Sequence, residues 1–462
     1  MRNPPDIIEV LARTQSGEYC TTKDWDTRRV PGAVRQMLQK HGLAKTCDTQ
    51  NPCNYDFELA DRFYQAGFEL ALELGYHVLD TQRTVKVSRE ELQNALKYAP
   101  SQVFVGEGKD GTLIKHRTPG DPYPMASVCS LGITNSEAMF PLITLGIARE
   151  RAVDILEAGS LITLRGHEVL SGTPWETLLG YEHARMHLDI RRKAGRPGMG
   201  AIGCISAVTE YGQFGAYGTP GGFRTTDLAL ILFPSELKID YRTLHKVIHT
   251  LNCGGMMKCD SPSMIGGMAG PPEGAVICSI ACALLSYAIL QNTVGGGEIY
   301  DVRYLANVNR EGLWALSVTA QALARNTHIC SHIIANQVSG PVTASLLYEI
   351  AAGVGVIAAS GASMSTGPRS AGGKLNDHIT PLECRFMGEI CHAASGISPQ
   401  HMNEICKELL PKYEDRLKNP DVGKPFQEAY NVERLEPTAE WEDIYRRVKA
   451  EMIQLGIPMD EF

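Results

Sequence analysis

Short apolar stretches alternate with longer helical patterns along the middle of the chain. The apolar stretches recur near residues 128–134, 160–164, 199–208, 228–233, 254–259, 298–304, 328–335 and 354–359. The clearest helical patterns cover residues 176–193, 241–251, 275–291 and 310–326. Repetition of a strand followed by a helix is typical of parallel strands joined by crossover connections. Roughly eight such repeats favour a closed (β/α)8 barrel over an open sheet.

The segments on either side of this region have other patterns. Near the N-terminus, Asp56 can cap a helix with one apolar face, and residues 88–91 form a capping box before another helix. Beyond about residue 380 the chain is helical and rich in charge. We predict an N-terminal helical and mixed extension over 1–120, the barrel over 121–380, and a C-terminal helical extension over 381–462 that packs on the barrel.

Composition narrows the function classes. The chain has 462 residues, 44% hydrophobic and 21% charged, with a formal net charge of -8. The acidic balance argues against nucleic acid as the main partner, because phosphate binding needs a basic surface. The 13 cysteines form no disulfide framework, and neither a secretory signal nor an apolar run of transmembrane length is visible. We therefore expect a cytoplasmic protein with free thiols and no membrane contact.

Residues 194–204, with the sequence AGRPGMGAIGC, form the most informative segment. The pattern predicts a helix end, a glycine-rich turn and a buried strand. Together with stretches at 20–26, 236–240, 266–270, 385–389 and 423–428, in the same order along nearly the whole chain, it resembles the monomethylamine methyltransferases. Members of that family hand a methyl group to a corrinoid protein.

The resemblance implies a (β/α)8 barrel with helical additions at both ends, assembled as a homohexamer. It also implies a corrinoid protein as partner, which supplies the cobalamin, so that no cofactor is bound tightly by this chain. Active sites of such barrels lie at the carboxyl ends of the strands. We therefore expect residues 198–204 to lie at or near such an end.

The resemblance also implies site residues, with one departure from the family. A pyrrolysine, thought to capture the amine, follows the glycine-rich run in the family; the aligned residue here is Ile202, which has no electrophilic carbon. Asp260 aligns with an active-site glutamate, and Gln337, next to Asn336, aligns with an active-site glutamine. A carboxylate can pair with a substrate cation or share its proton, and an amide can orient a polar group. We predict pyrrolysine-independent methyl transfer from an N-methylated substrate, and we expect a cation such as a quaternary amine or an N-methyl amino acid.

Three further side chains have competing interpretations. Arg196 suits a substrate carboxylate, or it forms a structural ion pair at the helix end. Tyr211 and Tyr217 follow the strand that contains Ile202. Their aromatic faces could stabilise a quaternary ammonium group, or they could serve packing and surface roles.

Two alternative functions stay open. His328, Cys330 and His332 lie at period two on one strand face, and a zinc ion there would indicate a methyltransferase for O- or S-methyl substrates. Neighbouring same-face positions of one strand rarely converge on one tetrahedral ion, so we predict no metal site. The other alternative is a barrel that binds a small ligand or a corrinoid protein without methyl transfer.

Overall fold

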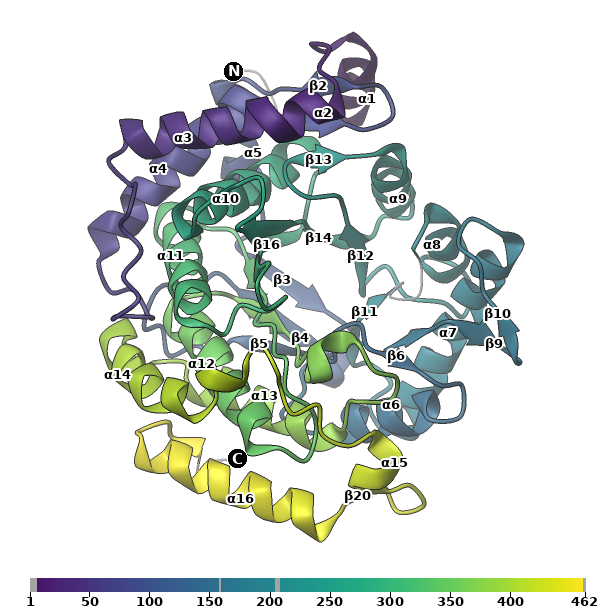
Figure 1. Cartoon of the computed structure of the whole chain (residues 1–462). Helices are drawn as coiled ribbons and strands as arrows, with labels where there is room; N and C mark the ends of the chain where they lie inside the picture. The colour runs from purple at the N-terminus through teal and green to yellow at the C-terminus, as the bar shows by residue number, and fades with distance from the viewer. Residues whose placement is uncertain (1–5, 158, 204–207, 460–462) are drawn as a thin grey trace.

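A closed barrel of eight parallel strands forms the centre of the computed structural model, which describes residues 6–157, 159–203 and 208–459 (Figure 1). β18 pairs with β5 and β16 with β14, which closes the ring. The predicted (β/α)8 barrel is therefore confirmed. In their order around the barrel the strands are β5 (Ala126–Cys129), β7 (Ile155–Leu156), β11 (Gly200–Gly203), β12 (Leu228–Leu232), β14 (Met256–Asp260), β16 (Val294–Asp301), β17 (Ser331–Ile333) and β18 (Met364–Thr366).

A helix follows each barrel strand and covers the outside of the barrel (Figure 1). An extra strand, β15 (Pro262–Ile265), pairs with the second half of β16. α13 lies beyond the predicted boundary at residue 380, so the predicted C-terminal extension includes the eighth barrel helix. The helices are α6 (Phe140–Arg149), α7 (Pro174–Lys193), α8 (Glu210–Ala216), α9 (Tyr241–Asn252), α10 (Pro272–Ile289), α11 (Arg310–Asn326), α12 (Ala344–Ala359) and α13 (Pro381–Ala393).

The side chains inside the barrel change from apolar to polar along the strands. Successive side chains of a strand point to opposite faces. One buried apolar cluster joins Val128, Ile155, Leu228 and Val294 from four strands with Cys330, the residue before β17. Buried polar and charged side chains follow on the same strands toward their carboxyl ends. This end of the barrel is called the mouth below.

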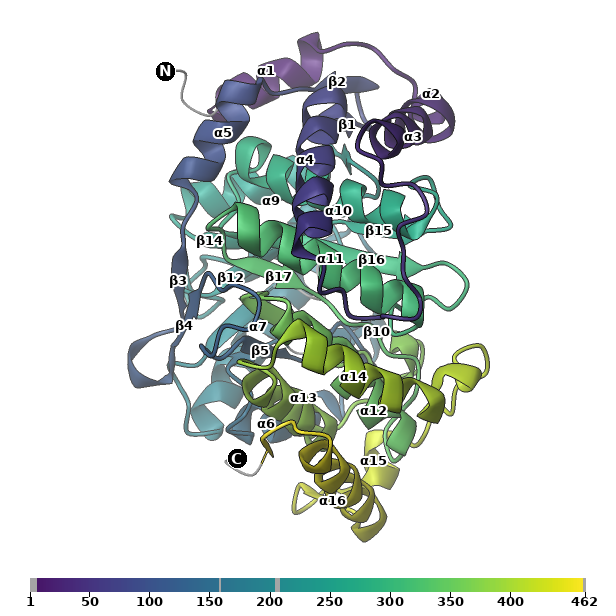
Figure 2. The ribbon, with the colours of Figure 1, turned by 90° about the vertical axis from the view of Figure 1, so that its left-hand side faces the viewer.

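The N-terminal extension closes the other end and covers one side. The hairpin of β3 (Gln102–Val105) and β4 (Thr112–Lys115) adds Val103, Val105 and Ile114 to the apolar cluster inside the barrel. α4 (Phe57–Leu74) packs across α10 and α11 (Figure 2). Asp56 caps α4, and the predicted capping box opens α5 (Arg89–Tyr98).

Further N-terminal elements lie above this side of the barrel in Figure 1. β1 (Tyr76–Val78) pairs with β2 (Arg83–Val85) and with β13 (Lys238–Ile239), which precedes α9. α1 (Ile7–Ser16) and α3 (Val30–Lys40) complete the layer. At the opposite end of the chain, α14 (Pro399–Leu409) and α16 (Ala439–Gln454) pack on α12 and α13.

Two predicted strands differ from the observed elements. Residues 160–164 form β8 (Ser160–Leu161) and β9 (Thr163–Leu164), and each of these pairs with another short strand outside the barrel. The barrel strand of this repeat is β7 at 155–156. Residues 354–359 are the end of α12, and β18 follows at 364–366. α12 is buried over nearly its whole length, so its apolar residues do not follow one face, and periodicity cannot separate such a helix from a buried strand.

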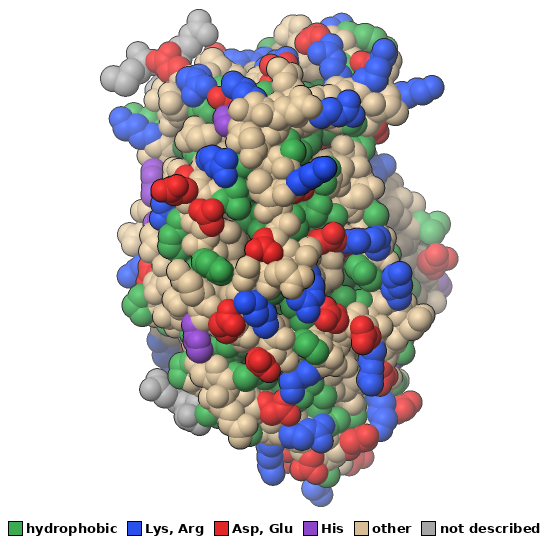
Figure 3. All heavy atoms as spheres, turned by 60° about the vertical axis from the view of Figure 1, so that its left-hand side comes forward, with side chains coloured by type: hydrophobic (Ala, Val, Ile, Leu, Met, Phe, Trp, Pro, Cys, Tyr) green, Lys and Arg blue, Asp and Glu red, His purple; other side chains and the backbone are tan. Residues whose placement is uncertain are grey.

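α10 is long and apolar enough to cross a membrane, but 94% of this 18-residue helix is buried inside the protein. It packs against α4, α11 and the barrel strands. The apolar composition of α10 is therefore explained by its place in the core. Figure 3 shows the side of the molecule on which α4 and α14 lie, where charged side chains of both signs are interspersed.

Candidate active site

A buried charged cluster lies at the mouth, where β14, β17 and β18 end. Lys258 Nζ lies 2.9 Å from Asp260 Oδ2. His332 Nδ1 lies 3.2 Å from the same oxygen, and His332 Nε2 lies 2.9 Å from Thr366 Oγ1. Asp260, Lys258 and His332 are each 1% exposed. Strand alternation brings these side chains together, because Lys258, Asp260, His332 and Thr366 all face the interior.

The electrostatics of the cluster keep Asp260 ionised. Burial raises the pKa of Asp260, but Lys258 and His332 outweigh burial and hold that pKa well below its usual range. Burial, helped by Lys258, lowers the pKa of His332 to about 4. A neutral imidazole beside a carboxylate donates from Nδ1, so Nε2 accepts from the Thr366 hydroxyl. Asp260 therefore has two fixed partners and stays negative at neutral pH.

A second polar group comes from β16 and the segment after β17. The Tyr300 hydroxyl lies 2.7 Å from Glu298 Oε1 and 3.1 Å from Asn336 Oδ1. Asn336 Nδ2 donates to Glu298 Oε1 at 3.4 Å. Gln337 Oε1 accepts from the Arg369 backbone N–H at 2.9 Å, whereas the buried Gln337 Nε2 has no hydrogen-bond partner. The amide nitrogen of Gln337, with its two N–H groups, is thus available to a ligand or a water.

Glu157, directly after β7, is the carboxyl group that the sequence interpretation missed. It is 1% exposed, and its buried Oε2 has no hydrogen-bond partner. Burial raises its pKa to about 7; Lys258 opposes this rise, and Asp260 and Glu298 add to it. Ile155, two residues earlier, belongs to the apolar cluster inside the barrel, so strand alternation places Glu157 on the same interior face.

Ile202 lies in β11, between these polar groups and the apolar interior. It is fully buried in the cluster that contains Ile155 and Leu228, and it pairs with Leu228. In the neighbouring strand, Ile155 pairs with Gly200 and Leu156 with Ala201. Glu157, one residue further along, therefore lies beside Ile202 in the parallel register. At this position the chain has an apolar wall next to a carboxyl group.

Comparison with known proteins identifies the family of the chain. The family described as "Monomethylamine methyltransferase MtmB" matches residues 5–457. The chain belongs to this family. MtmB of Methanosarcina mazei is 28% identical over 456 residues, and MtmB3 of Methanosarcina barkeri is 29% identical over 453 residues; each match covers 98% of both chains.

Solved structures of the MtmB family agree over the whole chain. The crystal structure of Methanosarcina barkeri MtmB superposes with a TM-score of 0.94 at 27% identity, covering 99% of each chain. A structure of the hydroxylamine MtmB complex superposes with the same TM-score and coverage. The present chain is therefore a corrinoid-protein-dependent methyltransferase built on a TIM barrel. This family membership excludes the alternative function of a barrel that only binds a ligand.

The expected position of the glycine-rich run of this MtmB-family chain needs correction. Gly198 precedes β11, and its N–H donates to Asp110 Oδ2 in the segment between β3 and β4. Gly198 is thus at the amino end of the strand, opposite the mouth. Its Cα approaches the neighbouring backbone so closely that an added Cβ would lie 2.1 Å from the carbonyl oxygen of Glu107. The run permits close packing of the closing hairpin; Cys204 lies outside the described residues.

Arg196 and Tyr217 also lie at the amino end, which contradicts their expected substrate contacts. Arg196 Nη1 donates to the carbonyls of Ala148, Glu150 and Val153 at 3.3, 3.1 and 2.8 Å, all before β7. In place of the expected ion pair, Arg196 donates hydrogen bonds to these three backbone carbonyls. Tyr217 is fully buried, and its hydroxyl donates to Asp227 O at 3.0 Å, beside the start of β12.

Tyr211 is the other tyrosine of the prediction, and it lies on the surface. It is in the first turn of α8, its side chain is 45% exposed, and its ring contacts Phe214 edge-on. Since α8 begins on the side of the mouth, Tyr211 lies at the rim rather than among the buried polar groups.

The zinc hypothesis on β17 is not supported by the positions of its side chains. His328 Nε2 contacts the Ala99 carbonyl at 2.9 Å on the exposed amino side. Cys330 belongs to the apolar interior, and His332 reaches Asp260 at the mouth. Same-face residues are about 6.6 Å apart along a strand, so these three side chains point to three different environments. Within the described residues no group of three or more His, Cys, Asp or Glu side chains could hold a metal ion.

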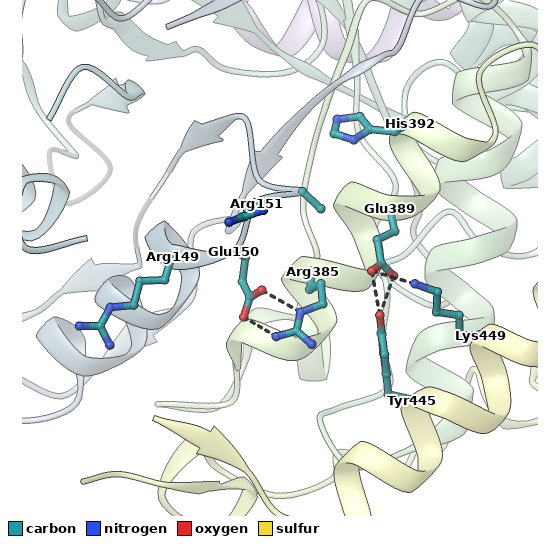
Figure 4. A pocket seen from close by; sticks show the side chains of 9 residues that line it. Arg149, Glu150, Arg151, Arg385, Glu389, His392, Tyr445 and Lys449 are labelled. Atoms are coloured by element: carbon teal, nitrogen blue, oxygen red, sulfur yellow. Dashed lines mark hydrogen bonds and ion pairs between the residues drawn. The ribbon is translucent and has the colours of Figure 1, made fainter. Parts of the chain in front are cut away.

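A pocket of about 560 Å³ lies away from the mouth, between the segment before β7, α13 and α16 (Figure 4). Glu150 binds Arg385 through two contacts of 2.7 and 3.1 Å. Glu389 accepts hydrogen bonds from Tyr445 at 2.8 Å and from Lys449 at 3.1 Å. These pairs give the motif at 385–389 a structural role in joining α13 to α16 and to the loop before β7.

Proposed function

We propose that the chain transfers a methyl group from a cationic N-methylated substrate to the corrinoid of a partner protein, without pyrrolysine. The observation that supports this most is the charge of the mouth. Three buried carboxyl groups, on Glu157, Asp260 and Glu298, accompany one buried cation, Lys258. Lys258 is already paired with Asp260, whereas Glu157 Oε2 has no hydrogen-bond partner. A buried unpaired carboxyl group is unfavourable unless a cation or a proton neutralises it.

A cationic substrate fits the chemistry of these residues. A methyl group on a positively charged nitrogen leaves behind a neutral amine, which is a far better leaving group than an amide anion. The reduced corrinoid of the partner protein supplies the nucleophile. The residues of this chain then hold the cation, exclude water and orient the methyl group toward the partner. Asp260 and Glu157 supply the negative charge, and Ile202 supplies an apolar wall rather than a covalent attachment.

The amide side chains favour a substrate with a second polar group. Gln337 Nε2 is buried and without a hydrogen-bond partner, and Asn336 lies beside it in the chain. An amide N–H donates to carboxylate or hydroxyl oxygens. We infer that the substrate is a quaternary amine or an N-methyl amino acid, with the cation at Glu157 and Asp260 and any carboxylate at Gln337.

The test is methyl transfer to a reduced corrinoid protein, followed by its absorption spectrum. The purified chain is incubated with that protein, a reductant and one candidate at a time: tetramethylammonium, a betaine, an N-methyl amino acid or monomethylamine. We expect methylation with a cationic compound and none when the substrate is omitted. No methylation with any quaternary amine, betaine or N-methyl amino acid would contradict the proposed function.

Asp260→Asn tests the proposed machinery. The substitution keeps the shape of the side chain and removes the charge, which leaves Lys258 without its buried partner. We expect kcat/KM to fall by about tenfold to a hundredfold, because a hydrogen-bonded charge contributes about 1.5–3 kcal/mol and the unpaired lysine repels the substrate cation. Unchanged kcat/KM would remove Asp260 from the mechanism. Circular dichroism and thermal unfolding of the variant separate this loss from misfolding.

The assembly and location of the protein belong to the same proposal. We propose a homohexamer, on the family resemblance, which sedimentation velocity of the purified chain would test. We also propose a cytoplasmic location, which is supported by the free thiols of all the cysteines within the described residues. Fractionation of the producing cells would test it.

A further inference from the structure

Arg369 is a half-buried arginine at the mouth, in the loop that follows β18. Its backbone N–H donates to Gln337 Oε1 at 2.9 Å, and Ala371 N–H donates to the Ser339 carbonyl at 2.7 Å. The loops after β17 and β18 therefore lie side by side. Because a backbone N–H can only donate, the amide oxygen of Gln337 faces Arg369, and the amide nitrogen is buried without a hydrogen-bond partner.

The guanidinium of Arg369 lies beside the second polar group of the candidate active site. Its Cζ is 5.4 Å from the centre of the Tyr300 ring, and Nη1 donates to the Leu305 carbonyl at 3.0 Å. The Tyr300 hydroxyl in turn contacts Asn336. The backbone of Gly373 comes so close that an added Cβ would lie 3.0 Å from Arg369 Nε. These contacts hold the guanidinium between the loops after β16 and β18.

This guanidinium forms no ion pair within the part of the chain that the structure describes. Arg303, in the loop after β16, instead pairs with Asp301 and Glu311. A guanidinium presents five N–H donors in a planar fork, and the Leu305 carbonyl accepts from Nη1 alone. Arginine binds a carboxylate through two parallel hydrogen bonds, so the remaining donors suit a carboxylate ligand.

Glu298 is a carboxyl group of the mouth on which this charge acts. Burial raises the pKa of Glu298, and the Tyr300 hydroxyl and Arg369 oppose the rise. Glu298 Oε1 accepts from the Tyr300 hydroxyl at 2.7 Å and from Asn336 Nδ2 at 3.4 Å. Among the described residues, no hydrogen bond joins Glu298 to the guanidinium. Glu298 therefore leaves the donors of Arg369 available.

The mouth thus carries opposite charges at two places. Glu157 and Asp260 offer negative charge to a cation. Arg369 and Gln337 Nε2 offer donors to an anion, whereas Arg196 lies at the opposite end of the barrel. We propose that Arg369 and Gln337 together bind a carboxylate of the substrate, so that the methyl donor is a betaine or an N-methyl amino acid and not a simple alkylammonium. This inference rests on the proposed function, because it takes the methyl donor to be a cation.

Matched pairs of methyl donors test the carboxylate subsite. Trimethylglycine is compared with isobutyltrimethylammonium, and N-methylglycine with N-methylisobutylamine, in methyl transfer to the reduced corrinoid protein. In each pair an isopropyl group replaces the carboxylate, so the shape is nearly kept and the negative charge is lost. We expect the wild type to show a kcat/KM at least about tenfold higher for the carboxylated member, the contribution of a charge-assisted hydrogen bond. Equal values within a pair, or a preference for the isopropyl member, would overturn the proposal.

Substitution of Arg369 shows whether this side chain causes the preference. Arg369→Gln should lower the ratio of the two kcat/KM values by about tenfold to a hundredfold. Arg369→Lys keeps the charge without the planar fork and should give an intermediate ratio. Arg165→Gln is the matched control, because Arg165 is an exposed arginine after β9, and it should keep the wild-type ratio. An unchanged ratio in Arg369→Gln and Arg369→Lys would overturn the role of Arg369, even if the two rates fall together.

Failure of this inference differs from failure of the proposed function. If the wild type uses the isopropyl compounds as well as the carboxylated ones, the proposed function stands and the carboxylate subsite is wrong. If no compound methylates the corrinoid protein, the proposed function fails, and calorimetric titration of the chain with trimethylglycine and N-methylglycine decides on the subsite. Binding to the wild type that Arg369→Gln weakens by about tenfold would support the subsite. Equal binding to both chains, or no binding to the wild type, would overturn it.

Discussion

Replacing Glu157 with glutamine removes a carboxyl group from the barrel interior and keeps the size of the side chain. The wild-type Glu157 is buried, Oε2 has no hydrogen-bond partner, and burial raises the pKa from 4.5 to about 7. The folded protein therefore binds a proton on this group more tightly than the unfolded chain does. The stability associated with Glu157 is fully present below the unfolded-state pKa and is lost as pH rises through about 7.

The size of this effect follows from the two pKa values. At about pH 8 the wild type loses about 3 kcal/mol of unfolding free energy through Glu157, and at about pH 5 about 1 kcal/mol. Glutamine does not titrate. The unfolding free energy of Glu157→Gln minus that of the wild type should therefore rise by about 2 kcal/mol between these pH values. Urea unfolding followed by tryptophan fluorescence at both pH values measures the difference.

The same substitution should weaken substrate binding. Loss of a carboxylate that contacts a cation removes about 1.5–3 kcal/mol, so we expect the KM for the cationic substrate to rise by about tenfold to a hundredfold. Greater stability at alkaline pH combined with weaker binding is the expected signature of a group that serves the ligand rather than the fold. In the wild type, substrate affinity should increase as pH rises through about 7, because Glu157 then ionises.

Glu383→Gln is a suitable control because burial also raises the pKa of Glu383 to about 7. Glu383, at the start of α13, accepts hydrogen bonds from the Thr380 N–H and the Ser370 hydroxyl. Its substitution should lower stability at acidic and neutral pH and leave the KM unchanged. The reasoning on Glu157 is refuted if the stability difference of Glu157→Gln is independent of pH, or if its KM equals that of the wild type.

Two further predictions concern the amino end of the barrel. Arg196→Met should lower the unfolding free energy by about 1–3 kcal/mol, because three carbonyls lose their donor, and should leave the substrate KM unchanged; a raised KM would restore Arg196 to the substrate site. Asp227→Ala should cost about 3–5 kcal/mol in urea unfolding, because it leaves the fully buried Arg191 unpaired. Arg446→Ala, in an exposed pair, should cost less than about 1 kcal/mol, and equal costs would contradict the argument from burial.

The fold was largely predictable from the alternation of apolar segments, but two strands were misplaced. β7 has only two residues, Ile155 and Leu156, and a run this short has no measurable periodicity. The end of α12 is buried on all sides, so its composition matches that of a strand as well as a helix. Where a helix has one exposed face, as α4 and α5 have, the pattern and the caps placed the element well.

The misplacement of β7 also explains the missed carboxyl group. Glu157 follows directly after Leu156, so a strand assigned to 155–156 would have placed this carboxyl at the mouth. Arg196 and Tyr217 show the converse error. Arg196 precedes β11, and Tyr217 follows the last residue of α8, so both lie at the amino end of the barrel. The chemistry of Arg196 suits a carboxylate and that of Tyr217 suits a cation, but their positions keep both away from the mouth.

The sequence by itself determined the barrel and the family, because hydrophobic periodicity and the order of motifs can be read directly from the amino-acid sequence. It also determined that an isoleucine stands where the family has pyrrolysine. Only the tertiary structure decided which polar groups meet. Lys258, Asp260 and His332 come from two strands and converge because both strands end at the same mouth. Glu157 became a candidate because its carboxyl group is buried without a hydrogen-bond partner, and burial depends on the whole fold.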